Sequence, residues 1–328
     1  MLKRMFALAM AGAALLALTV LAGGAAGKSS SSGAAAADIT LGFSQVGSES
    51  GWRAANTKSI QSAAKEAGIN LKFSDAQQKQ QNQIAAIRSY IQQRVDVIAF
   101  SPVVASGWDS VLREAKRAKI PVVLTDRAVD SKDKTLYKTF LGSDFIKEGR
   151  LAGAWVANQY KHAKAPVNIV VLEGTTGSSP AIDRKAGFAS AIKGNPNLKI
   201  IASQTGEFTR AKGKEVMTAF LKANPKIDLL FAHNDDMGLG AIEAIEAAGL
   251  KPGKDIKIVT IDAVHDGMVA LAAGKINFIA ECSPLLGPQL MGLVKRVVAG
   301  QAVPKRIVTK ETTFNQQQAK DALPTRKY

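Results

Sequence analysis

The chain has 328 residues, of which 46% are hydrophobic and 6% are aromatic, and its formal net charge is +16 at pH 7. This length and composition exclude a fibrous or disordered protein and favour two α/β lobes over one. The basic residues are scattered along predicted helices, as in "REAKRAKIP", so we expect a solvated basic surface and no nucleic-acid partner.

The N-terminus has the layout of a secretory signal peptide. Lys3 and Arg4 precede a long apolar run, and small residues follow as far as Ala37. We therefore expect residues 1–37 to be a signal peptide and the mature chain to be free in the periplasm. A membrane anchor is the alternative, because residues 6–26 are nearly long enough to span a bilayer. Cys282 is the only cysteine, so no intramolecular disulfide is possible, and its apolar neighbours predict a buried thiol.

Predicted strands and helices alternate after this leader. In the first half, strands are expected at 39–46, 69–76, 95–103 and 120–128, with helices at 53–68, 78–94 and 108–118 between them. The second half repeats the pattern from residue 144, where a helix is expected, with strands at 167–174, 198–205, 228–235 and 256–263 and helices at 179–194, 212–224 and 237–249; a stretch at 276–284 and a helix at 285–300 remain to be packed. Apolar strands that alternate with helices indicate a parallel sheet covered on both faces. The fold class is therefore α/β, with two successive doubly wound units.

Ligands of open α/β sheets bind beyond the carboxyl ends of the strands. The residues at these ends are 44–53, 101–102 and 126–127 in the first unit, and 174–184, 234–235 and 262 in the second. They are rich in Arg, Asp, Asn and Ser and include Trp52. Guanidinium groups and carboxylates can each engage neighbouring hydroxyls, and an indole ring can cover the C–H face of a sugar. This set predicts a polyhydroxylated ligand.

Catalytic and cofactor patterns are missing from the sequence. The three histidines lack metal-ligand spacing, and there is no phosphate-binding loop, dinucleotide fingerprint or Gly-x-Ser-x-Gly elbow. We therefore expect a binding protein without cofactor or metal, and not an enzyme. For single residues, a purely structural role is the alternative to ligand binding. These alternatives are a surface ion pair for Asp126 and Arg127, a solvated side chain for Arg184, a helix cap for Asn234 and a core position for Trp52.

From residue 39 to about 310 the chain resembles the periplasmic sugar-binding proteins of the ribose/galactose type that serve ABC importers. The motifs "TDR", "AIDRKAGF", "HNDDMGLGAI" and "TIDA" carry this resemblance. The stretches "GFSQVGSESGWRAA", "QQKQQNQIAAIRSYIQQRVD", "SPVVASGW" and "KGKEVM" are similar to the galactofuranose-binding members.

The resemblance implies the type I periplasmic binding protein fold, in which a three-strand hinge joins the lobes. It implies a first lobe of residues 38–142 plus 282–310 and a second lobe of 143–281 plus 311–328. The ligand-binding residues that it implies are Glu49, Ser50, Gly51, Trp52, Arg53, Asp126, Arg127, Arg184, Asn234, Asp262 and Glu281.

The function implied is capture of a monosaccharide, galactofuranose in particular, by hinge closure and its delivery to an ABC transporter permease in the inner membrane. We expect a monomer. Another pentose or hexose, such as ribose or galactopyranose, is the alternative ligand. A LacI-type effector domain shares the fold, but the export signal and the absence of a helix-turn-helix argue against it. An exported hydrolase would need a nucleophile or an acid/base pair, and none is evident.

Overall fold

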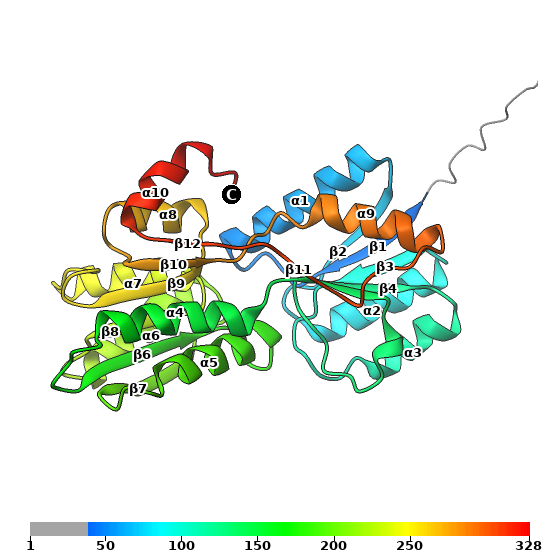
Figure 1. The fold of residues 1–328 in the computed structure, drawn as a ribbon. Coiled ribbons are helices and arrows are strands. Elements are labelled where there is room, and N and C mark those ends of the chain that lie inside the picture. The colour runs from blue at the N-terminus through cyan, green and yellow to red at the C-terminus, as the bar shows by residue number, and fades with distance from the viewer. Residues whose placement is uncertain (1–38) are drawn as a thin grey trace, which may run out of the picture. The chain divides into compact units, whose positions relative to one another are not determined.

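The computed structural model describes residues 39–328, so the predicted signal peptide lies outside the described residues. Two six-stranded sheets, each covered by helices, make up this part of the chain (Figure 1). They confirm the predicted α/β class with two parallel-sheet lobes. Among residues 39–328, no helix combines the length and the apolar character needed to cross a membrane.

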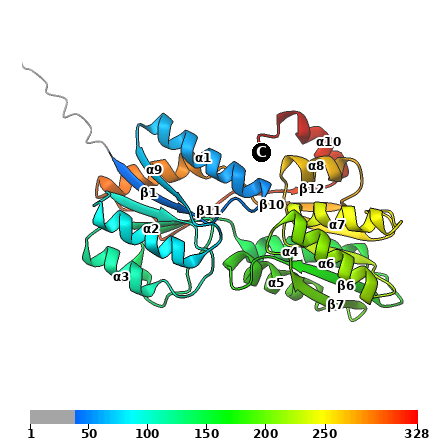
Figure 2. The same cartoon turned by 180° about the vertical axis from the view of Figure 1, so that it is seen from behind.

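The first lobe is built on the sheet β11-β5-β4-β3-β1-β2, in which every neighbouring pair is parallel. Leu41 and Phe43 of β1 pack with helices α1 and α9 on one face, whereas Ile98 and Phe100 of β3 pack with α2 and α3 on the other. Figure 2 shows these two helix pairs on opposite faces of the sheet. The elements of this lobe are β1 (Thr40–Gln45), α1 (Gly51–Ala67), β2 (Asn70–Asp75), α2 (Gln80–Gln92), β3 (Val97–Phe100), α3 (Asp109–Arg117), β4 (Val122–Thr125), a 3₁₀ turn (Lys134–Leu136), β5 (Thr139–Gly142), α9 (Gly287–Val298) and β11 (Arg306–Val308).

The second lobe is built on the sheet β12-β10-β9-β8-β6-β7, which is parallel except for the short strand β12. Helices α4 and α5 cover one face, and α6, α7, α8 and α10 cover the other. Its elements are α4 (Phe145–Gln159), β6 (Val167–Glu173), α5 (Ser179–Ile192), β7 (Leu198–Thr205), α6 (Arg210–Ala223), β8 (Leu229–Ala232), α7 (Asp235–Ala247), β9 (Lys257–Asp262), α8 (His265–Ala272), β10 (Phe278–Glu281), β12 (Thr313–Phe314), α10 (Gln316–Ala322) and a 3₁₀ turn (Leu323–Thr325).

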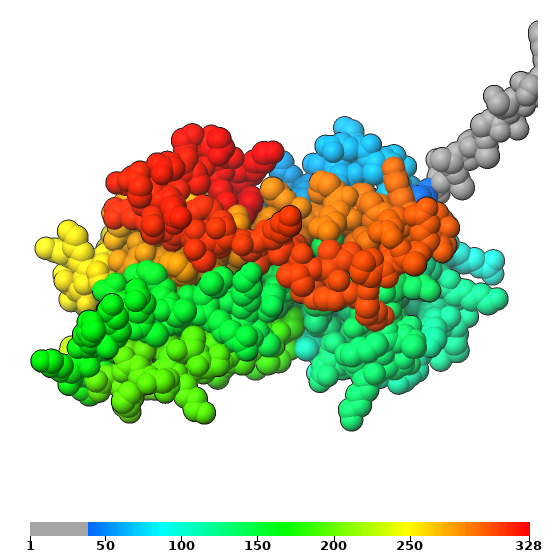
Figure 3. All heavy atoms as spheres, in the orientation of Figure 1, coloured from blue at the N-terminus to red at the C-terminus, as the bar shows by residue number. Residues whose placement is uncertain are grey.

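The chain passes between the two sheets three times: after β5, after β10 and between β11 and β12. Three crossings agree with the three-strand hinge that the family resemblance implies. Strand β5, helix α8 and the helices and strands after residue 300 have no counterpart in the sequence-based prediction. The C-terminal residues lie at the surface, where α10 packs beside α8 (Figure 3).

Helices α4 and α5 of the second lobe pack closely together and thereby position two side chains of the site. A Cβ atom on Gly149 of α4 would stand 2.2 Å from the main-chain oxygen of Arg184 in α5, so only glycine allows the two helices to approach this closely. The approach brings Glu148, next to Gly149, within reach of the Arg184 side chain.

Candidate functional site

One cavity lies between the carboxyl ends of the two sheets. All predicted site residues except Gly51 and Glu281 line it. Its other lining residues are Phe145, Pro180, Phe208 and Cys282. Residues that lie far apart in the sequence therefore meet in one cavity, as expected from the rule that ligands of α/β sheets bind beyond the strand ends.

Arg53 holds a buried network on the first-lobe side. Its Nε lies 3.1 Å from Glu49 Oε1 and its Nη2 lies 2.8 Å from Asp126 Oδ2, while its Nη1 donates to Gln45. Asp126 also accepts a hydrogen bond from Ser101 Oγ at 2.8 Å. Burial alone would lower the pKa of Arg53, but Asp126 and Glu49 outweigh it and raise that pKa. The guanidinium group is thus charged and fixed in orientation.

Arg127 is the less well paired arginine of this half. Its Nη1 donates to the carbonyl of Val103 at 3.1 Å, but its Nε and the Oε2 atom of Glu49 are buried without a hydrogen-bond partner among residues 39–328. Burial and the positive charge of Arg53 lower the pKa of Arg127 to about 10, so it is still protonated at neutral pH. Buried polar atoms without partners are costly, and ligand hydroxyls are groups that would satisfy both.

Arg184 occupies the corresponding place on the second-lobe side. Its Nε lies 2.7 Å from Glu148 Oε2, its Nη1 donates to the carbonyl of His233 at 2.5 Å, and its Nη2 lies 3.5 Å from Asp262 Oδ1. Arg184 is only 3% exposed, so the alternative of a solvated helix arginine is wrong. Burial raises the pKa of Glu148 to about 8 although Arg184 opposes the shift.

Two aspartates occupy equivalent positions in the two lobes. Asp126 follows β4 with φ 62°, and Asp262 ends β9 with φ 124°, so both have the left-handed backbone that residues other than glycine rarely adopt. Such strain concentrates at functional sites, where the surrounding structure holds it in place. Here it turns each carboxylate toward an arginine of its own lobe, Arg53 or Arg184.

Trp52 lies across the boundary between the lobes. Its indole Nε1 donates to the carbonyl of Cys282 at 2.6 Å, and the guanidinium carbon of Arg53 lies 4.6 Å from the centre of its ring. It is 5% exposed and packs against the core cluster that covers one face of the second sheet. Trp52 thus has core contacts as well as its place on the cavity wall, and its stacking on a sugar stays a prediction.

The helix termini at the site hold three further residues in place. Ser50 is the N-cap of α1 and accepts from Arg53 N at 3.1 Å. Asn234 caps α7 by accepting from Met237 N at 3.0 Å, so its predicted alternative role as a helix cap coexists with its place on the cavity wall. Gly51 lies outside the lining, and its N–H donates to Asp236 Oδ2 of the opposite lobe at 2.9 Å.

Glu281 lies away from the cavity and holds the C-terminus. Its Oε1 is 2.8 Å from Arg326 Nη1 and accepts from the Tyr328 hydroxyl at 2.9 Å. The side chain thus contacts Arg326 and Tyr328 near the C-terminus, and the structure gives no support to its predicted role in ligand binding.

Sequence reasoning missed Phe145 and Phe208, the two phenylalanines of the second lobe that line the cavity, and Phe208 lies against both Arg127 and Arg184. The guanidinium carbon of Arg127 lies 5.3 Å from its ring centre and that of Arg184 lies 5.9 Å away. A Cβ atom on Gly174 would stand 1.9 Å from the ring, so this glycine makes room for the phenyl group. Phe208 follows β7 in the sequence, and the strand-end rule would have found it if β7 had been included. Glu148 carried no such signal, because it lies within a helix.

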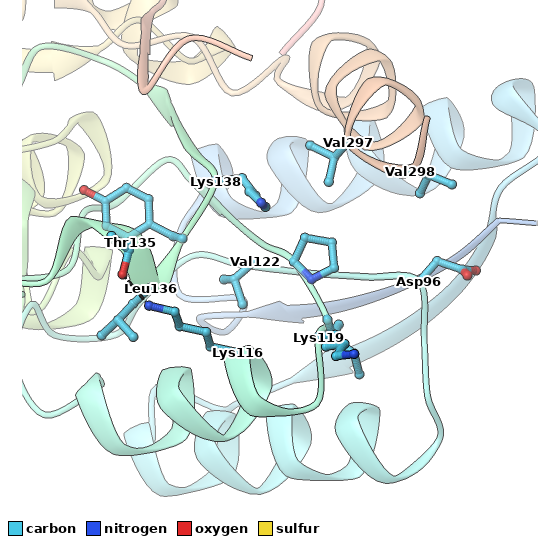
Figure 4. Close-up of a pocket in the computed structure, with 12 residues that line it drawn as sticks. Asp96, Lys116, Lys119, Val122, Thr135, Leu136, Lys138, Val297 and Val298 are labelled. Carbon is cyan, nitrogen blue, oxygen red and sulfur yellow. Dashed lines mark hydrogen bonds between the residues drawn. The ribbon is translucent and has the colours of Figure 1, made fainter. Parts of the chain in front are cut away.

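The space open to the centre of a water molecule in this cavity is about 20 Å³, so the side chains of the two lobes are drawn closely together. A larger hollow of about 530 Å³ lies elsewhere in the first lobe, where Lys116, Lys119 and Lys138 surround Val122 at the start of β4 (Figure 4). That hollow is at the amino ends of the strands, opposite to the ends where α/β sheets bind ligands. The charged cavity is therefore the candidate site in spite of its small volume. It offers fixed donors and acceptors from both lobes.

Residues 41–302 match the family described as periplasmic binding protein domain. The chain belongs to the periplasmic binding protein family. It is 52% identical to the galactofuranose-binding protein YtfQ of Escherichia coli (strain K12), an alignment that covers 89% of this chain and 92% of that protein. A crystal structure from Mycobacterium smegmatis in complex with β-D-fucofuranose has a chain that is 69% identical in sequence to this one. The structural alignment covers 88% of this chain and 94% of that chain, with a TM-score of 0.87. These relatives confirm the predicted family, and they agree with the expectation that the protein is not an enzyme.

A second crystal structure from Mycobacterium smegmatis is 67% identical with the same coverage of 88% and 94%, yet its TM-score is 0.67. The two structures thus have nearly the same sequence identity to this chain but different TM-scores. The arrangement described above is closer to that of the relative in complex with a furanose sugar.

Proposed function

We propose that the protein binds galactofuranose between its two lobes and delivers it to the permease of an ABC importer in the inner membrane. It acts in the periplasm as a monomer, after removal of residues 1–37 as a signal peptide. The first lobe consists of residues 38–142 and 282–310, and the second of 143–281 and 311–328. The observation that carries the proposal is the cavity in which arginine and carboxylate side chains of both lobes face each other.

The residues of this cavity suit ring hydroxyls. Neighbouring hydroxyls of a sugar can donate to Glu49 Oε2 and accept from Arg127 Nε, the two side-chain atoms of the cavity lining that are buried without a hydrogen-bond partner among residues 39–328. Hydrogen bonds to charged groups contribute about 1.5–3 kcal/mol each, which is more than neutral ones supply. We therefore assign the affinity mainly to Arg127 and Glu49, with Arg53 and Arg184 holding the carboxylates in place.

The two sugars named for the relatives share one ring. Fucofuranose is galactofuranose without the 6-hydroxyl group, so their ring hydroxyls have the same arrangement. A site that hydrogen-bonds these hydroxyls rejects an analogue that leaves one of its buried groups unpaired. We propose that the ring decides the specificity and that the 6-hydroxyl contributes little.

Hinge motion at the three crossings opens and closes the site. Three hydrogen bonds between the lobes would break on opening: Gly51 N to Asp236 Oδ2 at 2.9 Å, Ala105 N to Gly177 O at 2.8 Å and Ala128 N to Ser179 Oγ at 3.0 Å. The higher TM-score to the sugar complex than to the second Mycobacterium smegmatis structure supports this motion. The permease then distinguishes the closed from the open form.

Titration calorimetry of the mature protein with D-galactose, D-fucose, D-ribose and methyl galactopyranoside tests the proposal. D-galactose and D-fucose should bind, since both form the required furanose ring in water, while the locked pyranoside and ribose should bind at least tenfold more weakly. Equal affinity for the locked pyranoside would refute the assignment to a furanose. Lack of binding by all four sugars would remove the sugar-binding proposal itself.

A further inference from the structure

Four side chains meet where the three crossings lie side by side, and of these only Cys282 also lines the sugar cavity. Ser143 follows β5, Cys282 follows β10, and Thr309 and Glu311 lie between β11 and β12. Ser143 Oγ lies 3.3 Å from Cys282 Sγ and 3.2 Å from Thr309 Oγ1, and it donates a hydrogen bond to Glu311.

Helix α4 adds Glu148 to this cluster. Cys282 Sγ and one carboxylate oxygen each of Glu148 and Glu311 lie within 4.8 Å of one another. Glu148 Oε2 is occupied by Arg184, but Oε1 is buried without a hydrogen-bond partner among residues 39–328. A buried acceptor of this kind, beside a thiol and a second carboxyl group, is suited to bind a cation.

The charges near the cluster favour a cation as well. Arg184 contacts Glu148 and is shared with Asp262 at 3.5 Å, so it cannot neutralise all the acidic groups around it. Arg306 lies at the same crossing, but its guanidinium group donates to the carbonyls of Gly142 and Ser143 and thus does not pair with the carboxyl groups of the cluster. Metal ligands must be deprotonated, and in that state the two carboxylates and the thiolate together carry three negative charges that a divalent cation would offset in part.

We propose that Glu148, Cys282 and Glu311 bind one Zn²⁺ ion at the hinge. Zinc accepts mixed sulfur and oxygen ligands, whereas Ca²⁺ and Mg²⁺ are held by oxygen alone. Bond lengths of about 2.3 Å to sulfur and about 2.1 Å to oxygen place tetrahedral ligand atoms about 3.6 Å apart, so the ligand atoms must approach by up to about 1 Å. A water molecule or the Ser143 hydroxyl completes the four ligands. The ion ties α4 to two of the three crossings and thereby restrains the hinge.

Cobalt titration of the mature protein, without added thiols, is the direct test. Co²⁺ bound to a thiolate has a sulfur-to-metal charge-transfer band, and Cys282 is the only cysteine, so such a band can come from no other residue. We expect the band to appear at one equivalent and to disappear when Zn²⁺ displaces the cobalt. Mg²⁺ and Ca²⁺ should not displace it. Absence of the band in the folded protein would overturn the proposal.

Variants separate this site from metal binding elsewhere on the surface. Cys282→Ser should abolish the band, and Glu311→Gln should weaken Co²⁺ binding at least tenfold while the thiol remains. Glu215→Gln, which changes an exposed carboxylate on α6, is the matched control and should bind like the parent. If Cys282→Ser does not fold, Glu311→Gln decides: unchanged affinity in that variant would contradict carboxylate ligation. D-galactose binding by each variant reports separately on folding and on the sugar site.

Discussion

Replacement of Arg184 by alanine should destabilise the protein even without a sugar. The change leaves Glu148 and Asp262 buried without their cation, since Arg184 lies 2.7 Å from one and 3.5 Å from the other. It also removes the donor to the carbonyl of His233. Breaking a buried ion pair by removing one partner costs about 3–5 kcal/mol. At roughly 2 °C per kcal/mol for a chain of this size, Tm should fall by about 6–10 °C.

Thermal unfolding followed by circular dichroism, with Lys185→Ala as the control, measures this effect. Lys185 is the next residue of α5 and also pairs with a glutamate, but its side chain is 60% exposed, so its loss should cost less than about 1 kcal/mol. Adding Glu148→Gln to Arg184→Ala should restore part of the stability, because it replaces one of the two buried acidic groups left without Arg184. A Tm for Arg184→Ala equal to that of Lys185→Ala would refute the reasoning.

Three other outcomes are expected. Phe208→Ala should weaken galactose binding roughly tenfold in calorimetry, because the ring covers two guanidinium groups of the cavity; parental affinity would exclude the ring from the site. Glu281→Gln should leave that affinity within about twofold but speed amide exchange in residues 313–328, which Glu281 holds through Arg326 and Tyr328; a large loss of affinity with unchanged exchange would return Glu281 to the site. Burial raises the pKa of Asp235 from 3.8 to about 7, so the folded state keeps a proton that the unfolded state has lost. The free energy of unfolding should therefore fall from pH 4 to 7, by up to about 1.4 kcal/mol per pH unit from this group, and urea titrations of Asp235→Asn should show a shallower fall; an identical slope would contradict the assignment to Asp235.

The sequence predicts the α/β pattern well because the central strands are buried on both faces. Residues 97–100 and 229–232 are buried throughout, and such apolar runs are easily recognised. Strand β7 is different, since it lies at the sheet edge and most of its side chains are at least partly exposed. Phe208 lies just beyond the end of this exposed edge strand, where the sequence pattern gives the weakest indication of a binding site.

Site residues that directly follow a strand could be predicted, whereas their partners within helices could not. Asp126 and Asp262 are placed by the strand ends, but Glu148 lies on α4 in a stretch that looks like an ordinary amphipathic helix. Only the close packing of α4 on α5 brings its carboxylate to Arg184. The alternative in which Arg184 is a solvated helix arginine is wrong for the same reason: the close packing of α4 on α5 buries its side chain against Glu148.

We propose that the cavity between the lobes holds a sugar in its furanose form. The most direct test is a carbon NMR spectrum of D-galactose labelled at C1 and bound to the mature protein, because the anomeric carbons of the two ring forms have different chemical shifts. We predict a single bound furanose signal, although the pyranose is the dominant form in free solution, and loss of that signal in Arg127→Ala. A bound signal from the pyranose ring would contradict the account.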